Sequence, residues 1–178
     1  MRLIDVDHRR IVLADNIEDP RWIALSYVWG ESSPIAHINT IVNGHLPLQM
    51  PRTVQDAIIV TKNLGYRYLW KMDQIYKGAD LTAVAAAGDN KNNGLPGIGP
   101  TLRTNCGSVR LRKGVIFGMG PAPLKELRAL TWWTRVWTFQ EGYLSQRLLV
   151  FTDHQMTFYC NTSSWIEALS GPGPMGKV

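Results

Sequence analysis

The sequence is short of cysteine, of charged residues and of long apolar runs, and each shortage excludes a class of protein. Its two cysteines, Cys106 and Cys160, are far apart and lack Cys-x-x-Cys spacing, which argues against a disulfide framework or a zinc site. No apolar run approaches the length of a membrane span, and no basic-then-apolar leader opens the chain. We therefore expect a soluble, cytoplasmic protein without a membrane span.

Charge and histidine are equally uninformative about a ligand. Charged residues make up 19% of the chain, with a formal net charge of +5, and the basic residues are scattered rather than clustered. We therefore expect no nucleic-acid partner. The four histidines lack metal-ligand spacing, so we expect no metal, and we interpret His45 and His154 as solvated turn residues.

What the chain does have is apolar residues, 45% of its 178 positions, with seven tryptophans. This length supports one domain with a real core, which we place at residues 1–170, and a Gly/Pro-rich tail at 171–178 that we expect to be disordered.

Apolar runs and turn signals predict alternating strands and helices. Pro51 and Gly65 bracket the clearest helix, whose apolar stripe is Val54, Ala57, Ile58, Thr61 and Leu64. Strands are predicted at 22–28, 66–70, 81–87, 147–152 and 155–160, hairpins at 38–48 and 109–117, and helices at 51–64, 72–77, 123–130, 134–144 and 165–169, with Thr134 as a cap. This alternation predicts an α/β fold: a mixed, mostly parallel sheet flanked by helices.

The first candidate site is the exit of the first predicted strand. Ligands of open α/β sheets bind beyond the carboxyl ends of strands, so Ser26, Tyr27 and Trp29 could hold a nucleotide or sugar by hydroxyl groups and stacking. The alternative is a plain strand exit in which Gly30 supplies a positive φ. The Gly-rich segment 94–100 lacks the lysine of a phosphate loop, and its two prolines remove amide donors, so we interpret it as a loop.

The second candidate is Glu141. Helical spacing places it on one face with Trp137, and a carboxylate beside apolar rings acquires the raised pKa that acid–base work needs. The alternative is a surface acid that pairs with Arg135 or Arg147.

These landmarks, in this order, resemble the fungal heterokaryon incompatibility (HET) domain, over roughly residues 23–160. Each piece alone is weak, and the ordered set is specific. The pieces are Trp22-Ile23-Ala24-Leu25-Ser26-Tyr27-Val28-Trp29-Gly30; Leu48 with Pro51-Arg52-Thr53-Val54-Gln55-Asp56-Ala57; Leu64-Gly65-Tyr66-Arg67-Tyr68-Leu69-Trp70; Met72-Asp73-Gln74-Ile75-Tyr76 with Ala79, Leu81-Thr82 and Ala85-Ala86; Gly94-Leu95-Pro96-Gly97; Arg135-Val136-Trp137-Thr138-Phe139-Gln140-Glu141; and Leu144-Ser145 with Arg147-Leu148.

The resemblance implies a role in non-self recognition, in which such domains promote programmed cell death when genetically different hyphae fuse. It also implies a distant likeness to Toll/interleukin-1 receptor-type domains, some of which cleave NAD. By that likeness Glu141 is the catalytic carboxylate, which stabilises or deprotonates the ribose as nicotinamide leaves. Ser26, Trp29 and Gly30 line the nucleotide pocket, with Tyr27 and Trp137 beside them.

One departure from the family pattern follows Trp70. The family continues with a Val-Asp-x-x-Cys-Ile-Asp-Gln-like segment, whereas here Trp70 runs straight into Lys71 and Met72. The second strand is therefore expected to be short at the end where a site would form, and the helix after it to be marginal.

Three hypotheses follow. As an enzyme, the chain hydrolyses NAD as substrate and requires no cofactor. As an interaction module, it signals by self-association or through protein partners of the incompatibility system, using its tryptophan-rich surface. As a shortened remnant, it has no function.

Overall fold

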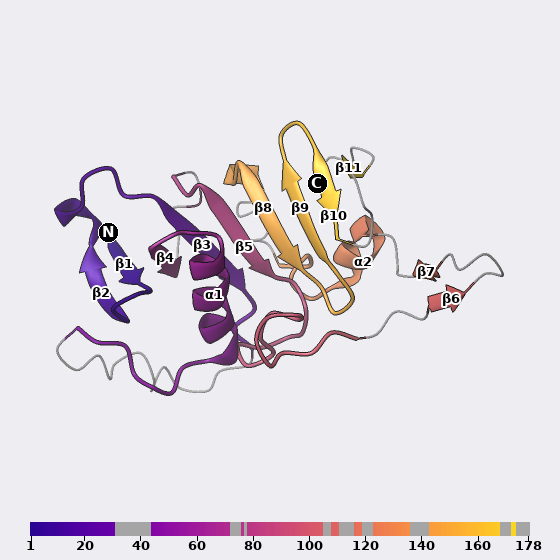
Figure 1. Ribbon diagram of the computed structural model, residues 1–178, viewed down its shortest axis with the longest axis horizontal. Helices are drawn as coiled ribbons and strands as arrows, with labels where there is room; N and C mark the ends of the chain where they lie inside the picture. The colour runs from indigo at the N-terminus through magenta and orange to yellow at the C-terminus, as the bar shows by residue number, and fades with distance from the viewer. Residues whose placement is uncertain are drawn as a thin grey trace.

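The computed structural model describes residues 1–30, 44–71, 76, 78–104, 108–110, 116–118, 123–135, 143–167 and 172–173. These residues form a mixed α/β fold around a nine-stranded sheet (Figure 1). In spatial order the strands are β11 (Pro172–Gly173), β10 (Ser164–Ile166), β9 (Met156–Cys160), β8 (Arg147–Phe151), β5 (Leu81–Ala85), β3 (Trp22–Tyr27), β4 (Tyr68–Lys71), β1 (Arg2–Asp5) and β2 (Arg10–Leu13).

The parallel pairs lie in the middle of this sheet. β4, β3, β5 and β8 run parallel to one another, whereas β1 and β2 at one edge and β9 to β11 at the other pair antiparallel. The expected mixed sheet is thus confirmed, but the expectation that it is mostly parallel is wrong, because short connections at both edges add antiparallel strands.

The remaining elements are short except for one helix. They are η1 (Ala14–Asn16), α1 (Arg52–Asn63), α2 (Pro123–Ala129) and a separate hairpin of β6 (Ser108–Arg110) and β7 (Ile116–Gly118). In Figure 1, α1 lies in front of the sheet, and the β6–β7 hairpin projects beyond the β11 edge.

Side chains that alternate along the central strands build a core on each face. One face packs against α1 through Val54, Ala57 and Ile58, and the other packs against Leu127 of α2 and Trp132. Full burial of one such aliphatic side chain contributes about 1.5–3 kcal/mol. The strand residues of the first face include Ile23, Leu25, Leu81, Ala83, Leu149 and Phe151, and those of the second include Val84, Leu148 and Val150.

Most predicted elements are found within two residues of their expected positions. Helix α1 begins at Arg52, one residue after Pro51, and Gly65 ends it with a φ of +75°. Its stripe holds for four positions, but Leu64 is 45% exposed, because it lies past the last helical turn. The predicted hairpin at 109–117 is confirmed by β6 and β7.

One prediction at the C-terminal end is wrong. Residues 164–166 form strand β10 instead of opening a helix, because β9 offers its free edge and pairs Ser164 with Tyr159. Pro172 and Gly173 pair in turn with β10, and the other residues of the predicted tail, 171 and 174–178, lie outside the described residues. The Thr134 hydroxyl donates to the Thr131 carbonyl and caps no described amide.

Several predictions fall outside the described residues. They are the first arm of the hairpin at 38–43, most of the short helix at 72–77, and residues 136–142 of the helix predicted at 134–144. Within the part of the chain that the structure describes, no helix is long and apolar enough to cross a membrane.

Candidate functional site

The carboxyl ends of the four parallel strands lie along one edge of the sheet, which is where α/β sheets bind ligands. Residues 28–30 follow β3, residues 86–90 follow β5, and residues 152–154 follow β8. Asp89 and Asn90 are exposed at this edge, and Trp29 and Gly30 are half-buried. This edge is the candidate site.

Strand alternation separates Ser26 from Tyr27. Ser26 is buried, and its Oγ accepts a 2.7 Å hydrogen bond from the indole N–H of buried Trp132. Tyr27 belongs to the core on the α1 face, and its ring stacks on Trp29 with centroids 5.4 Å apart. Burial raises the pKa of the Tyr27 phenol, so the ring stays neutral. The structure thus brings Tyr27 and Trp29 together and places Ser26 under the Trp132 indole.

Gly30 is a close-approach glycine. Its φ is +80°, and a Cβ there would lie 2.7 Å from Cβ of Asn90. The loop after β5 therefore packs directly on the backbone at the exit of β3, and a larger residue at position 30 would displace it. This contact fixes the loop after β5 against the end of β3 at the candidate edge.

Trp137 and Glu141 lie outside the described residues, but the chain on both sides of them is placed. On the N-terminal side, Nη1 of Arg135 donates to the Tyr27 carbonyl at 3.1 Å. On the C-terminal side, the Ser145 and Thr82 hydroxyls hydrogen-bond at 2.7 Å. Both flanks of the Glu141 segment therefore attach to the central strands β3 and β5.

The strand after helix α1 is short where the sequence predicts it. β4 pairs with β3 as far as Leu25–Lys71, whereas β5 pairs with β3 as far as Tyr27–Ala85. Among the described residues, the pairing of β4 with β3 therefore ends two residues before the pairing of β5 with β3, and residues 72–75 after β4 lie outside the described residues.

A buried carboxylate that sequence reasoning missed holds the Gly-rich loop. Asp56 on α1 is fully buried and forms an ion pair with Arg52 at 2.8 Å. Its Oδ2 accepts hydrogen bonds from the Thr101 hydroxyl at 2.6 Å and from the Leu95 amide at 2.9 Å. The Gly94 amide donates to the Thr53 hydroxyl at 3.1 Å.

This arrangement explains the glycines of segment 94–100. A Cβ on Gly94, where φ is +78°, would lie 2.6 Å from Oδ2 of Asp56. The predicted loop is confirmed, and its Leu95 amide donates to a carboxylate of the chain itself. The spacing of Arg52 and Asp56, four residues apart on a helix, was the available signal.

A second pair that was missed joins α2 to the end of β8. Nδ1 of His154 lies 2.7 Å from a carboxylate oxygen of the buried Glu126. The interpretation of His154 as solvated is therefore wrong, since its ring is the partner of a buried acid. His45 is exposed, and its backbone forms an isolated antiparallel β-bridge with Arg10. Among the described residues, no three metal-ligating side chains gather in one place.

Comparison with protein families gives one match. Residues 22–70 and 71–141 match the family described as heterokaryon incompatibility protein (HET). The two matched ranges meet between Trp70 and Lys71, where the sequence departs from the family pattern. No curated protein and no solved structure matches the chain.

Proposed function

The chain belongs to the heterokaryon incompatibility protein family, and from this we propose that it acts in fungal non-self recognition and promotes cell death when genetically different hyphae fuse. The family match covers α1, β3, β4, β5 and the residues of the candidate edge that follow β3 and β5, so it supports a function related to heterokaryon incompatibility. We propose in addition that it acts in a fungus, in the cytoplasm, and through cell death.

The candidate edge is the proposed site, and the contact of Arg135 with the Tyr27 carbonyl carries this assignment. Arg135 stands six residues before Glu141, and Trp132 of the same turn is bonded to Ser26. These two contacts attach the segment that leads to Trp137 and Glu141 to the strand whose exit carries Trp29 and Gly30. We also propose that the domain is distantly similar to Toll/interleukin-1 receptor-type domains, with helices flanking the sheet.

One mechanism for this site is hydrolysis of NAD. The bond between the ribose C1′ and nicotinamide breaks, water supplies the new oxygen on C1′, and a proton is released with nicotinamide and ADP-ribose. Glu141 stabilises the positive charge that develops on the ribose or accepts a proton from it. The Tyr27–Trp29 stack offers an aromatic surface for the nucleotide, and Trp137 lowers the polarity around the carboxylate.

The alternative mechanism is association with another protein or with a second copy of the chain. Large apolar side chains on the described surface favour it, since Leu48 is 90% exposed and Leu102 is 87% exposed. In this mechanism Glu141 performs no chemistry. In the third hypothesis the chain is a non-functional remnant, and the short β4 abolishes both NAD hydrolysis and association with another protein.

One experiment separates these hypotheses. The chain is expressed under an inducible promoter in a filamentous fungus, with dye uptake as the measure of cell death, and the purified protein is incubated with NAD while nicotinamide is quantified by chromatography. Glu141→Gln is compared with Glu18→Gln, a matched removal of an exposed carboxylate outside the family match.

We expect cell death with the native chain and with Glu18→Gln. Nicotinamide release that Glu141→Gln abolishes supports the enzyme. Cell death that persists in Glu141→Gln without nicotinamide release refutes the enzyme and supports association. A folded native chain that kills no cells refutes the proposed function itself.

A further inference from the structure

A row of side chains crosses four strands at the opposite end of β4 from the candidate edge. Strand register aligns Arg10 of β2 with Asp5 of β1, Asp5 with Tyr68 of β4, and Tyr68 with Trp22 of β3. The first two lie outside the residues matched by the family, so the row combines a part of this chain with the common sheet. Its centre is Asp5, which is 1% exposed.

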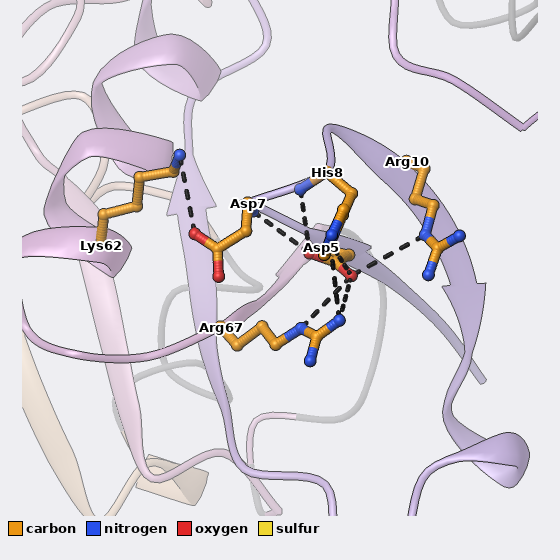
Figure 2. A network of polar contacts seen from close by, with 6 residues as sticks. All are labelled: Asp5, Asp7, His8, Arg10, Lys62 and Arg67. Atoms are coloured by element: carbon orange, nitrogen blue, oxygen red, sulfur yellow. Dashed lines mark hydrogen bonds and ion pairs between the residues drawn. The ribbon is translucent and has the colours of Figure 1, made fainter.

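Cationic groups surround the Asp5 carboxylate (Figure 2). Nη2 of Arg67 donates to Oδ2 at 2.9 Å, and Nε of the same guanidinium lies at 3.3 Å. Nδ1 of His8 is 3.0 Å from that oxygen, and Nε of Arg10 is 3.8 Å from it. The amides of Asp7 and His8 bond the other oxygen, each at 3.2 Å. One buried carboxylate therefore orients three half-exposed basic side chains.

The charges do not cancel. Two guanidinium groups face one carboxylate, which leaves a net positive charge before His8 is counted. The neighbouring Asp7 carboxylate interacts with Arg67 and is 3.7 Å from Nζ of Lys62, so with Lys62 included three cations face two carboxylates. The side chains of Arg67 and Arg10 are 47% and 49% exposed, so an anion in solution can reach them.

Among the described residues, these groups have N–H donors that no acceptor engages. A guanidinium carries five N–H donors, and Arg67 directs its Nε and Nη2 at Asp5. Both guanidinium groups lie within 3.8 Å of the same oxygen atom, so one tetrahedral oxyanion with hydrogen bonds of about 2.9 Å is large enough to reach both. Tyr68 supports the arrangement, because the Arg67 guanidinium lies 5.5 Å from its ring centroid.

We propose that Arg10 and Arg67, held by Asp5 and accompanied by His8, form a binding site for a phosphate group. Asp5 acts as a positioning residue behind the site, and the two guanidinium groups contact the phosphate oxygens. Because the carboxylate restrains their rotamers before the ligand arrives, binding loses less side-chain entropy than at mobile surface arginines. The site is independent of the proposed activity at the candidate edge.

The test is a titration of the isotope-labelled chain, followed by amide and arginine Nε–H resonances in NMR spectra at constant ionic strength. The probes are inorganic phosphate and the phosphomonoester AMP. We expect saturable shifts confined to residues 7–10 and 67–68. Similar affinity for both probes assigns the site to a phosphate group on a larger molecule as well as to the free ion, and binding of inorganic phosphate alone assigns it to the free ion. Shifts that never saturate, or that are spread over the surface, overturn the proposal.

Three variants sharpen the test. Arg10→Gln removes a donor whose long contact with Asp5 leaves the fold little affected, and it should weaken binding about tenfold, the equivalent of one charge-assisted hydrogen bond. Arg128→Gln, an exposed arginine on α2, should leave binding unchanged. Equal weakening by both would overturn the site.

Asp5→Asn distinguishes a built site from simple charge attraction. It makes the region more positive, so charge attraction alone predicts tighter binding, whereas loss of the positioning carboxylate predicts weaker binding. Tighter binding in a folded Asp5→Asn chain overturns the proposal. If this variant does not fold, the comparison of Arg10→Gln with Arg128→Gln still decides.

Discussion

The buried carboxylate of Asp5 predicts how the stability of the fold depends on pH. Burial alone raises the pKa of Asp5, but hydrogen bonds from Arg67 and from the amide and ring of His8, with the charge of Arg67, outweigh burial and lower the pKa from 3.8 to about 2. A depressed pKa means that the folded state holds the ionised form more tightly than the unfolded chain does. The shift corresponds to about 2 kcal/mol of stability at neutral pH.

The sign gives the pH window. This stability is fully present above the unfolded pKa of 3.8, and it is lost as the pH falls toward the folded value of about 2. We therefore expect the free energy of unfolding of the native chain to exceed that of Asp5→Asn by about 2 kcal/mol at pH 7 and at pH 5. The difference should shrink below pH 4 and nearly vanish by pH 2.

The assay is urea denaturation, followed by tryptophan fluorescence, at a series of pH values. Asp15→Asn is the matched control, because this carboxylate is 80% exposed and its change should stay within about 0.5 kcal/mol at every pH. A difference between the native chain and Asp5→Asn that is the same at pH 7 and pH 3 would refute the assignment of the effect to this ionisation.

Three further predictions concern contacts at the candidate edge and behind it. Ser26→Ala removes the acceptor of the buried Trp132 indole N–H and should lower the free energy of unfolding by about 1–3 kcal/mol in urea denaturation. The same change made in a Trp132→Phe chain should lower the free energy of unfolding less. Equal losses in both backgrounds would contradict the hydrogen bond. Asp56→Ala should destabilise the chain by about 3–5 kcal/mol, because Arg52, Thr101 and the Leu95 amide lose the carboxylate they share. It should also speed tryptic cleavage at Lys91 and Arg103. Unchanged cleavage would show that the loop is held in another way. Gly94→Ala and Gly65→Ala both place a side chain at positive φ, but of these two only the Cβ at Gly94 meets other atoms. Thermal denaturation should therefore show a loss of stability of about 1 kcal/mol for Gly65→Ala and of about 3 kcal/mol for Gly94→Ala. Equal losses would contradict the packing argument.

The central strands could be predicted because they are buried on both faces. β3 and β5 read as nearly continuous apolar runs with turn signals after them, and the structure places both within two residues of the expected ends. Helix α1 was equally clear, since Pro51 and Gly65 mark its ends by their backbone preferences.

The edge strands could not be predicted in the same way. β1, β2 and β10 are three or four residues long, too short for periodicity to separate strand from helix, and each exists because a neighbouring strand offers a free edge. Asp5 and Asp56 were missed for a related reason. A buried acid is recognisable only by its partners, and Arg67 is distant from Asp5 in sequence. The spacing of Arg52 and Asp56 indicates an ion pair on a helix, but the burial of Asp56 depends on the distant Thr101 and its loop.

The position of β1 in the sheet also constrains the order in which the chain can fold. β1 is synthesised before its partner β4, and Arg67, which pairs with Asp5, is made 62 residues after Asp5. At about 5–20 residues per second, that is a delay of roughly 3–12 seconds. β1 thus cannot complete its place in the sheet until β4 has been synthesised, and the pairing of Asp5 with Arg67 closes a loop of 62 residues.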